Sequence, residues 1–316
     1  MNSSFQSASE LTLLLKRIGK SFDAVQLSSG ALRGEFSLAD LGSIALLRIA
    51  TNQRLLLNGE RGHDCMTFCL ESTGLADEHR LFSIPIAPYS LNGLRQGQIE
   101  SHFQLTENTT TFLAITSVSR FNAFLGYCGA EDLIERLETH NALQLTPAMH
   151  GVLRQRFQQL LSTPPTTTQQ CHLAANELYA LFLQTMGNET SHGFLPFTPS
   201  PRQALVKAFV DWAFENACQE CNLDDISSYL YASRRTLIQG TKEALGMGPM
   251  EMLKQIRLEQ VNWMLRSSHA RANNGFTTIS EVARHFGFQS RGHFAKSYQT
   301  VFTESPSETL LKSLRV

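Results

Sequence analysis

The chain has 316 residues, of which 42% are hydrophobic and 17% are charged. This length predicts about two domains with cores that need no disulfide or metal support. The composition excludes a disordered, collagen-like or coiled-coil protein. Lys and Arg number 27 against 28 Asp and Glu, so the net charge alone argues against a nucleic-acid partner. Residues 234–296, however, hold 10 basic and 4 acidic side chains, and such a basic block points weakly to an anionic partner.

The first part of the chain is predicted to form a small β-barrel or sandwich. Between residues 21 and 127, short apolar segments rich in β-branched and aromatic residues are separated by turn formers such as Asn92-Gly93. The predicted strands cover residues 25–27, 44–49, 54–57, 66–70, 81–86 and 111–116. The apolar period then becomes helical, over residues 130–140, 148–161 and 171–186. We therefore expect a β-rich domain with added helices over residues 1–187.

A break rich in proline and glycine follows at residues 188–200, and it is the best candidate for an interdomain linker. The remaining residues, 201–316, are predicted to be entirely helical. The first helix of this region runs to about Cys218 and has one apolar face, made of Leu205, Phe209, Trp212 and Ala213.

Residues 279–302 predict a helix-turn-helix unit. A short helix ends at Gly287, where glycine tolerates a positive φ, and Phe288 fills the angle between the two helices. Ser290 is a good N-cap for the second helix, which in such a unit enters the major groove of DNA. The aromatic residues expected on its buried face are Phe294, Tyr298 and Phe302.

A similar unit is predicted at residues 223–245. Its second helix begins after Ser233, buries Leu237 and Ala244, and ends at a glycine turn. A long helix over residues 252–265 then joins the two units. One unit is weak evidence, but two in tandem with a basic surplus point strongly to DNA binding.

Residues 201–316 resemble the DNA-binding domain of the AraC/XylS family of bacterial transcription regulators, which has two helix-turn-helix units on a linker helix. The resemblance rests on residues 233–237, 246–249, 253–258, 282–283, 287–288, 294, 302 and 305–306. Residues 246–258 look especially like the subgroup containing the activator of ethanolamine-utilisation genes. The chain departs from the family pattern at Ser227, Tyr231 and Thr241, so we expect looser packing or less specific reading by the first unit.

The residues expected at the DNA are Ser233, Arg234, Arg235, Ile238, Gln239 and Lys242 in the first unit, and Gln289, Ser290, Arg291, Gly292, His293 and Lys296 in the second. Arginine can bond guanine and glutamine can bond adenine with two hydrogen bonds each. Ile238 is expected to touch a thymine methyl group. Ser290, Lys242 and the helix N-termini are expected to contact phosphates. Plain surface charge is the alternative for any single residue.

Four residues are expected to be structural. The resemblance implies that Arg257, in the linker helix, supports the fold between the two units, and we expect it to form an ion pair rather than a base contact. Gly287 and Phe288 shape the second turn, and Pro306 belongs to the closing signature of the family.

Two cysteine patterns contain residue types that bind metals, namely His63-x-Cys65-x3-Cys69 and Cys218-x-x-Cys221. Buried free cysteines are common, and no second pair completes a zinc site. We therefore expect no metal and no cofactor. Gly-rich phosphate loops and hydrolase motifs do not occur in the sequence, so an enzyme is not expected.

We expect a cytoplasmic transcription activator with double-stranded promoter DNA and RNA polymerase as partners. The sequence has no apolar run of about 18 residues and no signal-peptide pattern, so no membrane contact is expected. The N-terminal domain is predicted to bind a small-molecule effector at a site that the sequence leaves unknown. The helices at 148–161 and 171–186 either pack on this domain or form a homodimer interface. The alternatives are a regulator whose N-terminal domain only dimerises, and a small-molecule or metal-binding β-barrel protein.

Overall fold

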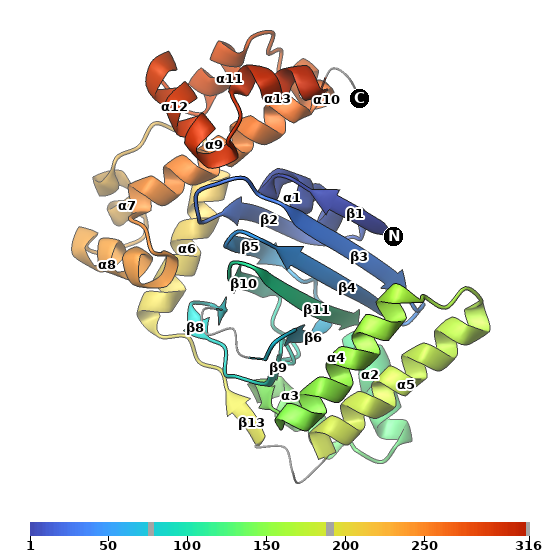
Figure 1. Cartoon of the computed structure of the whole chain (residues 1–316). Coiled ribbons are helices and arrows are strands. Elements are labelled where there is room, and N and C mark those ends of the chain that lie inside the picture. Colours follow the sequence, from blue (N-terminus) through green and yellow to red (C-terminus); the bar gives the residue numbers. More distant parts are fainter. Residues whose placement is uncertain (75–78, 188–192, 314–316) are drawn as a thin grey trace.

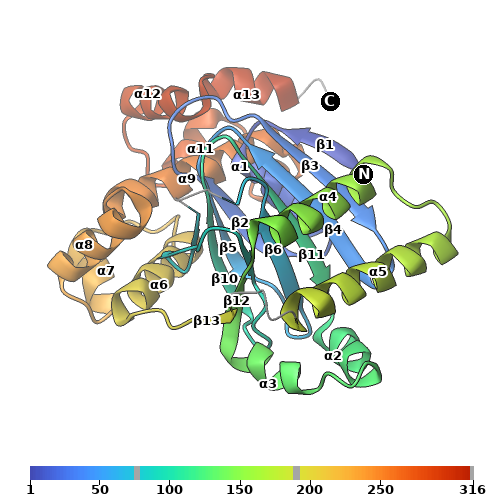
Figure 2. The ribbon, with the colours of Figure 1, turned by 60° about the horizontal axis from the view of Figure 1, so that its bottom comes forward.

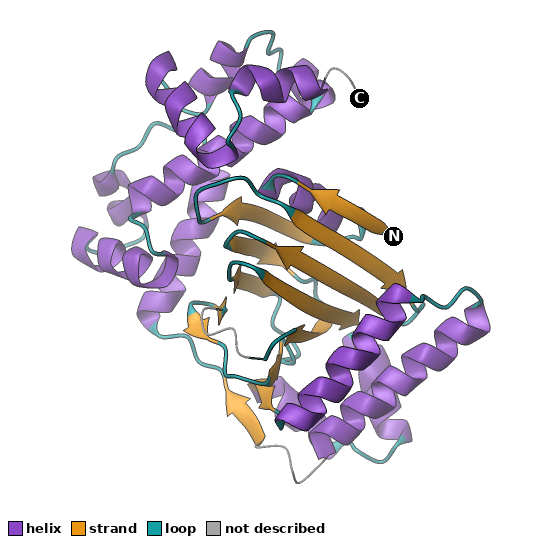
Figure 3. Ribbon diagram, viewed as in Figure 1, coloured by secondary structure: helices purple, strands orange, loops and turns teal. Residues whose placement is uncertain are grey.

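The computed structural model describes residues 1–74, 79–187 and 193–313. Figure 3 shows two regions in this part of the chain, a sheet-rich N-terminal region and a C-terminal region made of helices. This arrangement confirms the predicted fold class, a β-rich domain with helices followed by an all-α domain.

Two antiparallel sheets form the N-terminal region. The larger sheet contains, in spatial order, β1 (Asn2–Phe5), β3 (Gly34–Asp40), β4 (Ile44–Thr51), β11 (Thr109–Thr116), β6 (Met66–Glu71), β9 (Ser90–Asn92), β12 (His140–Gln144) and β13 (Gly193–Pro196). The smaller sheet contains β2 (Ser21–Gln26), β5 (Leu55–Glu60), β10 (Glu100–Leu105), β7 (Arg80–Leu81) and β8 (Ile84–Pro85).

The side chains of the central strands of the larger sheet point alternately to its two faces, and each face packs against a different layer. Successive side chains of a strand point to opposite faces. In β11, Phe112 and Ala114 pack with the helices that follow, whereas Leu113 and Ile115 face the core shared with the smaller sheet. The larger sheet is therefore the middle layer between a helical layer and the smaller sheet.

The helices of the N-terminal region are α1 (Ala8–Arg17), α2 (Val118–Tyr127), α3 (Asp132–Thr139), α4 (Pro147–Ser162) and α5 (Thr168–Gly187). Figure 2 shows α4 and α5 in front of the larger sheet, and residues of α2 to α5 share one core with it. Helix α1 instead packs into the core between the sheets.

Several elements differ from the sequence prediction. The strand expected at 81–86 is two short strands, because Phe82 and Ser83 both have positive φ between β7 and β8. Within the predicted linker, residues 188–192 lie outside the described residues. The next four residues form β13, which pairs with β12.

The C-terminal region consists of α6 (Pro201–Glu215), α7 (Leu223–Tyr229), α8 (Arg234–Leu245), α9 (Pro249–Arg266), α10 (Ser268–Asn273), α11 (Ile279–His285), α12 (Arg291–Phe302) and α13 (Pro306–Ser313). Figure 1 shows the long helix α9 between the α7–α8 pair and the α11–α12 pair. The first helix, α6, ends three residues before the predicted Cys218.

The C-terminal helices pack on the outer face of the smaller sheet. Val25 of β2 and Leu56 of β5 are completely buried in the same core as residues of α6, α8 and α9. This core is therefore continuous from the smaller sheet to α9.

Candidate nucleic-acid interface

The α7–α8 and α11–α12 pairs close with the same backbone turn. After α7, Tyr231 has a φ of 50°, and after α11, Gly287 has a φ of 82°. The N–H groups of Ala232 and Phe288 each donate to the carbonyl oxygen five residues earlier, at 3.0 Å. This is the Schellman type of helix end. The positive φ of Gly287 confirms the prediction, and Tyr231 adopts the same region although it carries a Cβ.

Both second helices start at a serine cap. The Ser233 Oγ accepts a hydrogen bond from the Thr236 N–H at 3.1 Å, and the Ser290 Oγ accepts one from the His293 N–H at 3.5 Å. Each bond satisfies an otherwise unpaired N–H of the first helical turn. The two predicted N-caps are therefore confirmed.

The inner faces of α8 and α12 are held differently. Thr241 on α8 is completely buried, and its hydroxyl donates to the Leu237 carbonyl at 2.9 Å, so this polar group has a partner in the core. On α12, Phe294 and Tyr298 are buried, with ring centroids 5.7 Å apart. Phe302, predicted to be buried, is only partly so because it stands at the last residue of the helix.

The outer faces carry the residues predicted to contact DNA. Ile238 is half-buried, and the others are exposed. The exposed residues are Ser233, Arg234, Arg235, Gln239, Lys242, Gln289, Ser290, Arg291, Gly292, His293 and Lys296. Within the described residues, the charged groups of Arg235, Lys242, Arg291 and Lys296 have no ion-pair partner. Four unpaired cations on two similar helices form a surface suited to a polyanion.

Three of the predicted DNA-contacting side chains are held by acidic residues. Arg234 forms an ion pair with Asp224 of α7. The Gln239 Nε2 donates to Glu243 Oε1 at 2.8 Å, and the Gln289 Nε2 donates to Glu220 Oε1 at 2.7 Å. The sequence reading missed these acidic partners. The Gln239–Glu243 pair was detectable from its four-residue spacing on a helix, whereas Glu220 lies 69 residues from Gln289.

Arg257 hydrogen-bonds the linker helix to the segment before α7 and lies close to the turn of the second unit. Its Nε donates to the Ala217 carbonyl at 2.9 Å and its Nη2 to the Gln219 carbonyl at 2.5 Å. A Cβ added at Gly287 would lie 3.1 Å from the Arg257 Nη1. The expected ion pair is therefore wrong within the described residues, because main-chain carbonyl oxygens provide the acceptors.

The other predicted structural residues lie around α12. Phe288 is half-buried, with its ring centroid 5.1 Å from that of Phe294. Pro306 is buried at the start of α13.

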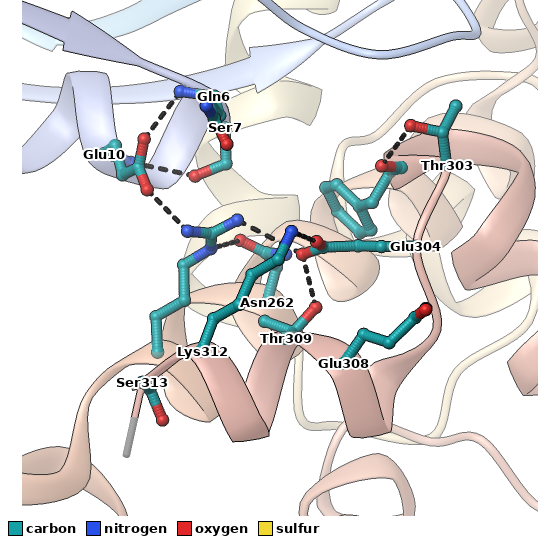
Figure 4. Close-up of polar contacts among 12 residues, drawn as sticks. Gln6, Ser7, Glu10, Asn262, Thr303, Glu304, Glu308, Thr309, Lys312 and Ser313 are labelled. Atoms are coloured by element: carbon teal, nitrogen blue, oxygen red, sulfur yellow. Dashed lines mark hydrogen bonds and ion pairs between the residues drawn. The ribbon is translucent and has the colours of Figure 1, made fainter. Parts of the chain in front are cut away.

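A polar cluster, named here the Arg266 cluster, joins α1 to α9 and to the segment before α13, and Figure 4 labels three of its residues, Glu10, Asn262 and Glu304. The cluster consists of Glu10, Asn262, Arg266 and Glu304. Arg266 contacts Glu10 at 2.5 Å, the Asn262 Oδ1 at 3.0 Å and Glu304 at 3.3 Å. The Ser9 hydroxyl of α1 also donates to Asn262 Oδ1, at 3.1 Å. One arginine thus connects α1, α9 and the segment before α13.

A buried carboxyl group lies in the same contact between the two regions. The Gln26 N–H of β2 donates to Glu259 Oε1 of α9 at 3.3 Å. Burial raises the pKa of Glu259 to about 8, because a charged carboxylate is disfavoured away from water. Burial therefore favours the protonated side chain, although the Gln26 N–H acts in the opposite direction.

An apolar pocket lies between the two sheets. Its walls include Phe22, Leu57 and Phe103 of the smaller sheet, and Leu47 and Leu113 of the larger sheet. Leu15 of α1 closes part of it.

One end of this pocket is polar. The Lys20 Nζ lies there, 3.2 Å from the Arg61 carbonyl and 3.1 Å from the Cys65 Sγ. The nearby Arg61 side chain is buried and donates to the Gly93, Arg95 and Gln98 carbonyls.

The residues singled out as alternative metal ligands do not form a cluster with other ligands. In the part of the chain that the structure describes, no group of three or more His, Cys, Asp or Glu side chains is placed to hold a metal ion. Cys65 and Cys69 are buried free thiols, and Cys218 lies 3.1 Å from the His285 Nε2. None of the described helices is long and apolar enough to cross a membrane.

A family model described as a helix-turn-helix domain matches residues 226–312. The chain is 31% identical over 115 residues to the probable thc operon regulatory protein of Rhodococcus erythropolis, covering 36% of this chain and 33% of that protein. It is 28% identical over 97 residues to the HTH-type transcriptional activator RhaS of Escherichia coli O157:H7, covering 31% and 32%. The chain thus spans about a third of the length of these relatives.

Among solved structures, a probable AraC family transcriptional regulator from Rhodopseudomonas palustris CGA009 is similar to part of this chain. It is 25% identical with a TM-score of 0.32, and the match covers 35% of this chain and 97% of that chain.

Proposed function

We infer from its AraC/XylS-type helix-turn-helix domain that this chain is a DNA-binding transcription regulator whose helices α8 and α12 enter two successive major grooves. The observation that carries this inference is the repeated geometry: two similar turns, two serine-capped helices, and exposed basic residues on both outer faces. Recognition helices of this kind bind half-sites about 34 Å apart along the duplex.

The exposed side chains divide into base-reading and phosphate-binding groups. Arg234, Arg235 and Gln239 are proposed to read bases from α8, with Ile238 against a thymine methyl group. From the second unit, the proposed readers are Gln289, Arg291, His293 and Lys296. Lys242 and the capped N-termini are proposed to bind phosphates, where charge fixes register and not sequence.

Salt dependence of binding separates these two groups. The full chain is titrated against random-sequence duplexes by fluorescence anisotropy at several salt concentrations. Lys242→Ala should weaken binding to all sequences alike and reduce the slope of log affinity against log salt by about one. If Lys242→Ala left the slope unchanged and lowered affinity for one sequence alone, the result would contradict a phosphate contact by Lys242.

The apolar pocket is proposed as the effector site of a sensor domain. Its walls suit a small apolar molecule, and the Lys20 ammonium at one end suits a polar or anionic group on that molecule. Sites of this shape are mostly apolar with a few polar groups that fix orientation.

Helix α1 is the proposed route from this pocket to the DNA-binding units. Leu15 of α1 lines the pocket, while Ser9 and Glu10 of the same helix contact α9. An effector that moves α1 would therefore shift the balance between arrangements of the two units.

Two variants separate binding from coupling. Leu113→Trp, which fills the pocket, should abolish the rise in melting temperature given by a small apolar acid. Arg266→Gln should keep that rise but remove any effect of the acid on DNA affinity. A screen in which no apolar acid or alcohol changes the melting temperature would favour the alternative, an N-terminal domain that only dimerises.

We propose activation through RNA polymerase as the regulatory output. The relative RhaS is described as an activator, and residues 246–258 resemble the ethanolamine subgroup of activators. Transcription of a reporter with the selected site upstream of a promoter should rise with the chain present. A fall would identify a repressor.

A homodimer is proposed through α4 and α5. Val152 of α4 and Leu173 of α5 are both about half-exposed, and we propose that a second copy of the chain covers them. Sedimentation of the full chain should show a dimer that Leu173→Glu dissociates, and a monomeric wild-type chain would refute the proposal.

A further inference from the structure

We propose that Glu243 is a positioning residue that fixes the amide of Gln239, so that α8 prefers adenine over guanine at one position of its half-site. The inference rests on the proposed DNA-binding function and adds to it the residue that sets base preference.

The carboxylate of Glu243 bridges two helices. One oxygen, Oε1, accepts from the Gln239 Nε2 at 2.8 Å, within α8. The other, Oε2, accepts from the Arg202 Nη1 of α6 at 3.0 Å. Because Arg202 belongs to another helix, Glu243 is anchored from outside the recognition helix. The Gln239 side chain is thereby fixed relative to the body of the domain.

The bonding fixes which end of the amide faces outward. The hydrogen bonds from Gln239 and Arg202 hold the pKa of Glu243 below its usual range, so the carboxylate is ionised at neutral pH. An ionised carboxylate only accepts hydrogen bonds. The amide of Gln239 must therefore turn its NH₂ group to Glu243, which leaves its carbonyl oxygen and its second N–H free.

This remaining pair of groups matches one purine. Adenine presents N7 as an acceptor and the N6 amino group as a donor in the major groove, and these pair with an amide N–H and an amide oxygen. Guanine presents two acceptors, N7 and O6, so a fixed amide oxygen faces an acceptor there. An amide free to rotate by 180° would present its NH₂ group to guanine instead.

A similar pair links Gln289 of the second unit to Glu220, in the segment before α7, and provides a matched control. The Gln289 Nε2 donates to Glu220 Oε1 at 2.7 Å, and both side chains are exposed. Glu220→Gln removes the same kind of contact from the other unit. Glu220→Gln should therefore change base preference only in the half-site that the second unit contacts.

The test measures base preference rather than affinity alone. DNA is first selected with the full wild-type chain, and the adenine read by Gln239 is the position whose preference Gln239→Ala removes. The ratio of affinities for adenine and guanine at that position is then measured by competition for wild type, Glu243→Gln, Gln239→Ala and the double variant. Glu243 is exposed, so Glu243→Gln should fold normally, which its melting temperature verifies.

Glu243→Gln should lower this ratio roughly 5- to 150-fold, the equivalent of one two-bond contact. It should also raise affinity for all DNA, because a negative charge near the phosphates is lost. In the Gln239→Ala background, Glu243→Gln should leave base preference unchanged, since the residue acts through Gln239. Glu220→Gln should leave this position unchanged.

Three results overturn the proposal. Glu243→Gln with an unaltered adenine-to-guanine ratio shows that the amide needs no anchor. An effect of Glu243→Gln on base preference that persists without Gln239 identifies Glu243 as a direct reader. A wild-type chain that selects no sequence at all refutes the DNA-reading function itself, which distinguishes that failure from a failure of the positioning role.

Discussion

Tyr231 has an unfavourable backbone conformation that glycine would relieve. Its φ of 50° lies in the left-handed region, which side chains with a Cβ disfavour. The side chain is 99% exposed, so its removal sacrifices almost no packing. Tyr231→Gly is therefore a nearly pure test of backbone strain at the turn of the first unit.

Two opposing effects set the size of the change. Relief of the left-handed conformation contributes roughly 1–2 kcal/mol. The greater freedom of glycine in the unfolded chain costs roughly 0.5–1 kcal/mol. We therefore expect Tyr231→Gly to raise the free energy of unfolding by about 0.5–1 kcal/mol. Tyr231→Ala keeps the Cβ and should give no such gain.

Urea unfolding followed by tryptophan fluorescence reports on this domain, because both tryptophans of the chain, Trp212 and Trp263, lie in the C-terminal region. The glycine variant should unfold at higher urea than both wild type and the alanine variant, with an unchanged slope. A glycine variant no more stable than the alanine variant would refute strain at this turn.

Three further predictions follow from single positions. Gly287→Ala should lower the free energy of unfolding by about 1–2 kcal/mol, because φ is 82° and the new Cβ would lie 3.1 Å from the Arg257 Nη1; a neutral effect in urea unfolding would contradict this. The pKa of Glu259 is about 8 in the folded chain against 4.5 in the unfolded chain, so the folded chain binds the proton more tightly. As pH rises from 4.5 to 8, the free energy of unfolding of wild type should therefore fall by up to about 1.4 kcal/mol per pH unit relative to that of Glu259→Gln. Parallel curves of stability against pH for the two proteins would refute this. Arg291→Ala should relax base preference at one position of the selected site while leaving the others intact, and a uniform loss would assign Arg291 to phosphate.

The helical units could be predicted because their signals are local. Ser233 and Ser290 cap helices through contacts only three residues away. Gly287 adopts the positive φ that its own turn requires. Because such features depend only on a few neighbouring residues, they can be recognised from the sequence.

The strand β10 escaped prediction because its burial depends on a distant partner strand, β5. In β10, His102 and Gln104 are polar but completely buried, so both faces of this strand are covered and burial does not follow the alternation of polar and apolar residues. The Nδ1 of His102 is 3.0 Å from the Asn58 Oδ1 on the neighbouring strand. Asn58 lies 44 residues before His102, so this partner depends on how the two strands pair.

The exposure of the proposed DNA-contacting residues could be predicted from helical spacing, but the hydrogen bonds that orient their side chains could not. Helical period predicts that Gln239 and Arg291 face outward. The pairing of Gln289 with Glu220 and the anchoring of Glu243 by Arg202 join separate helices. The carbonyl acceptors of Arg257 likewise come from residues about 40 positions away, which is why an ion pair was predicted in their place.

Selection of DNA from a random pool by the full chain, with Arg235→Ala/Arg291→Ala as the paired variant, tests the central claim most directly. Two recognition helices predict a recurring motif of two half-sites about one helical turn apart, which the double variant loses. Recovery of no motif by the wild-type chain at moderate salt, or of the same motif by the double variant, would contradict reading of DNA by α8 and α12.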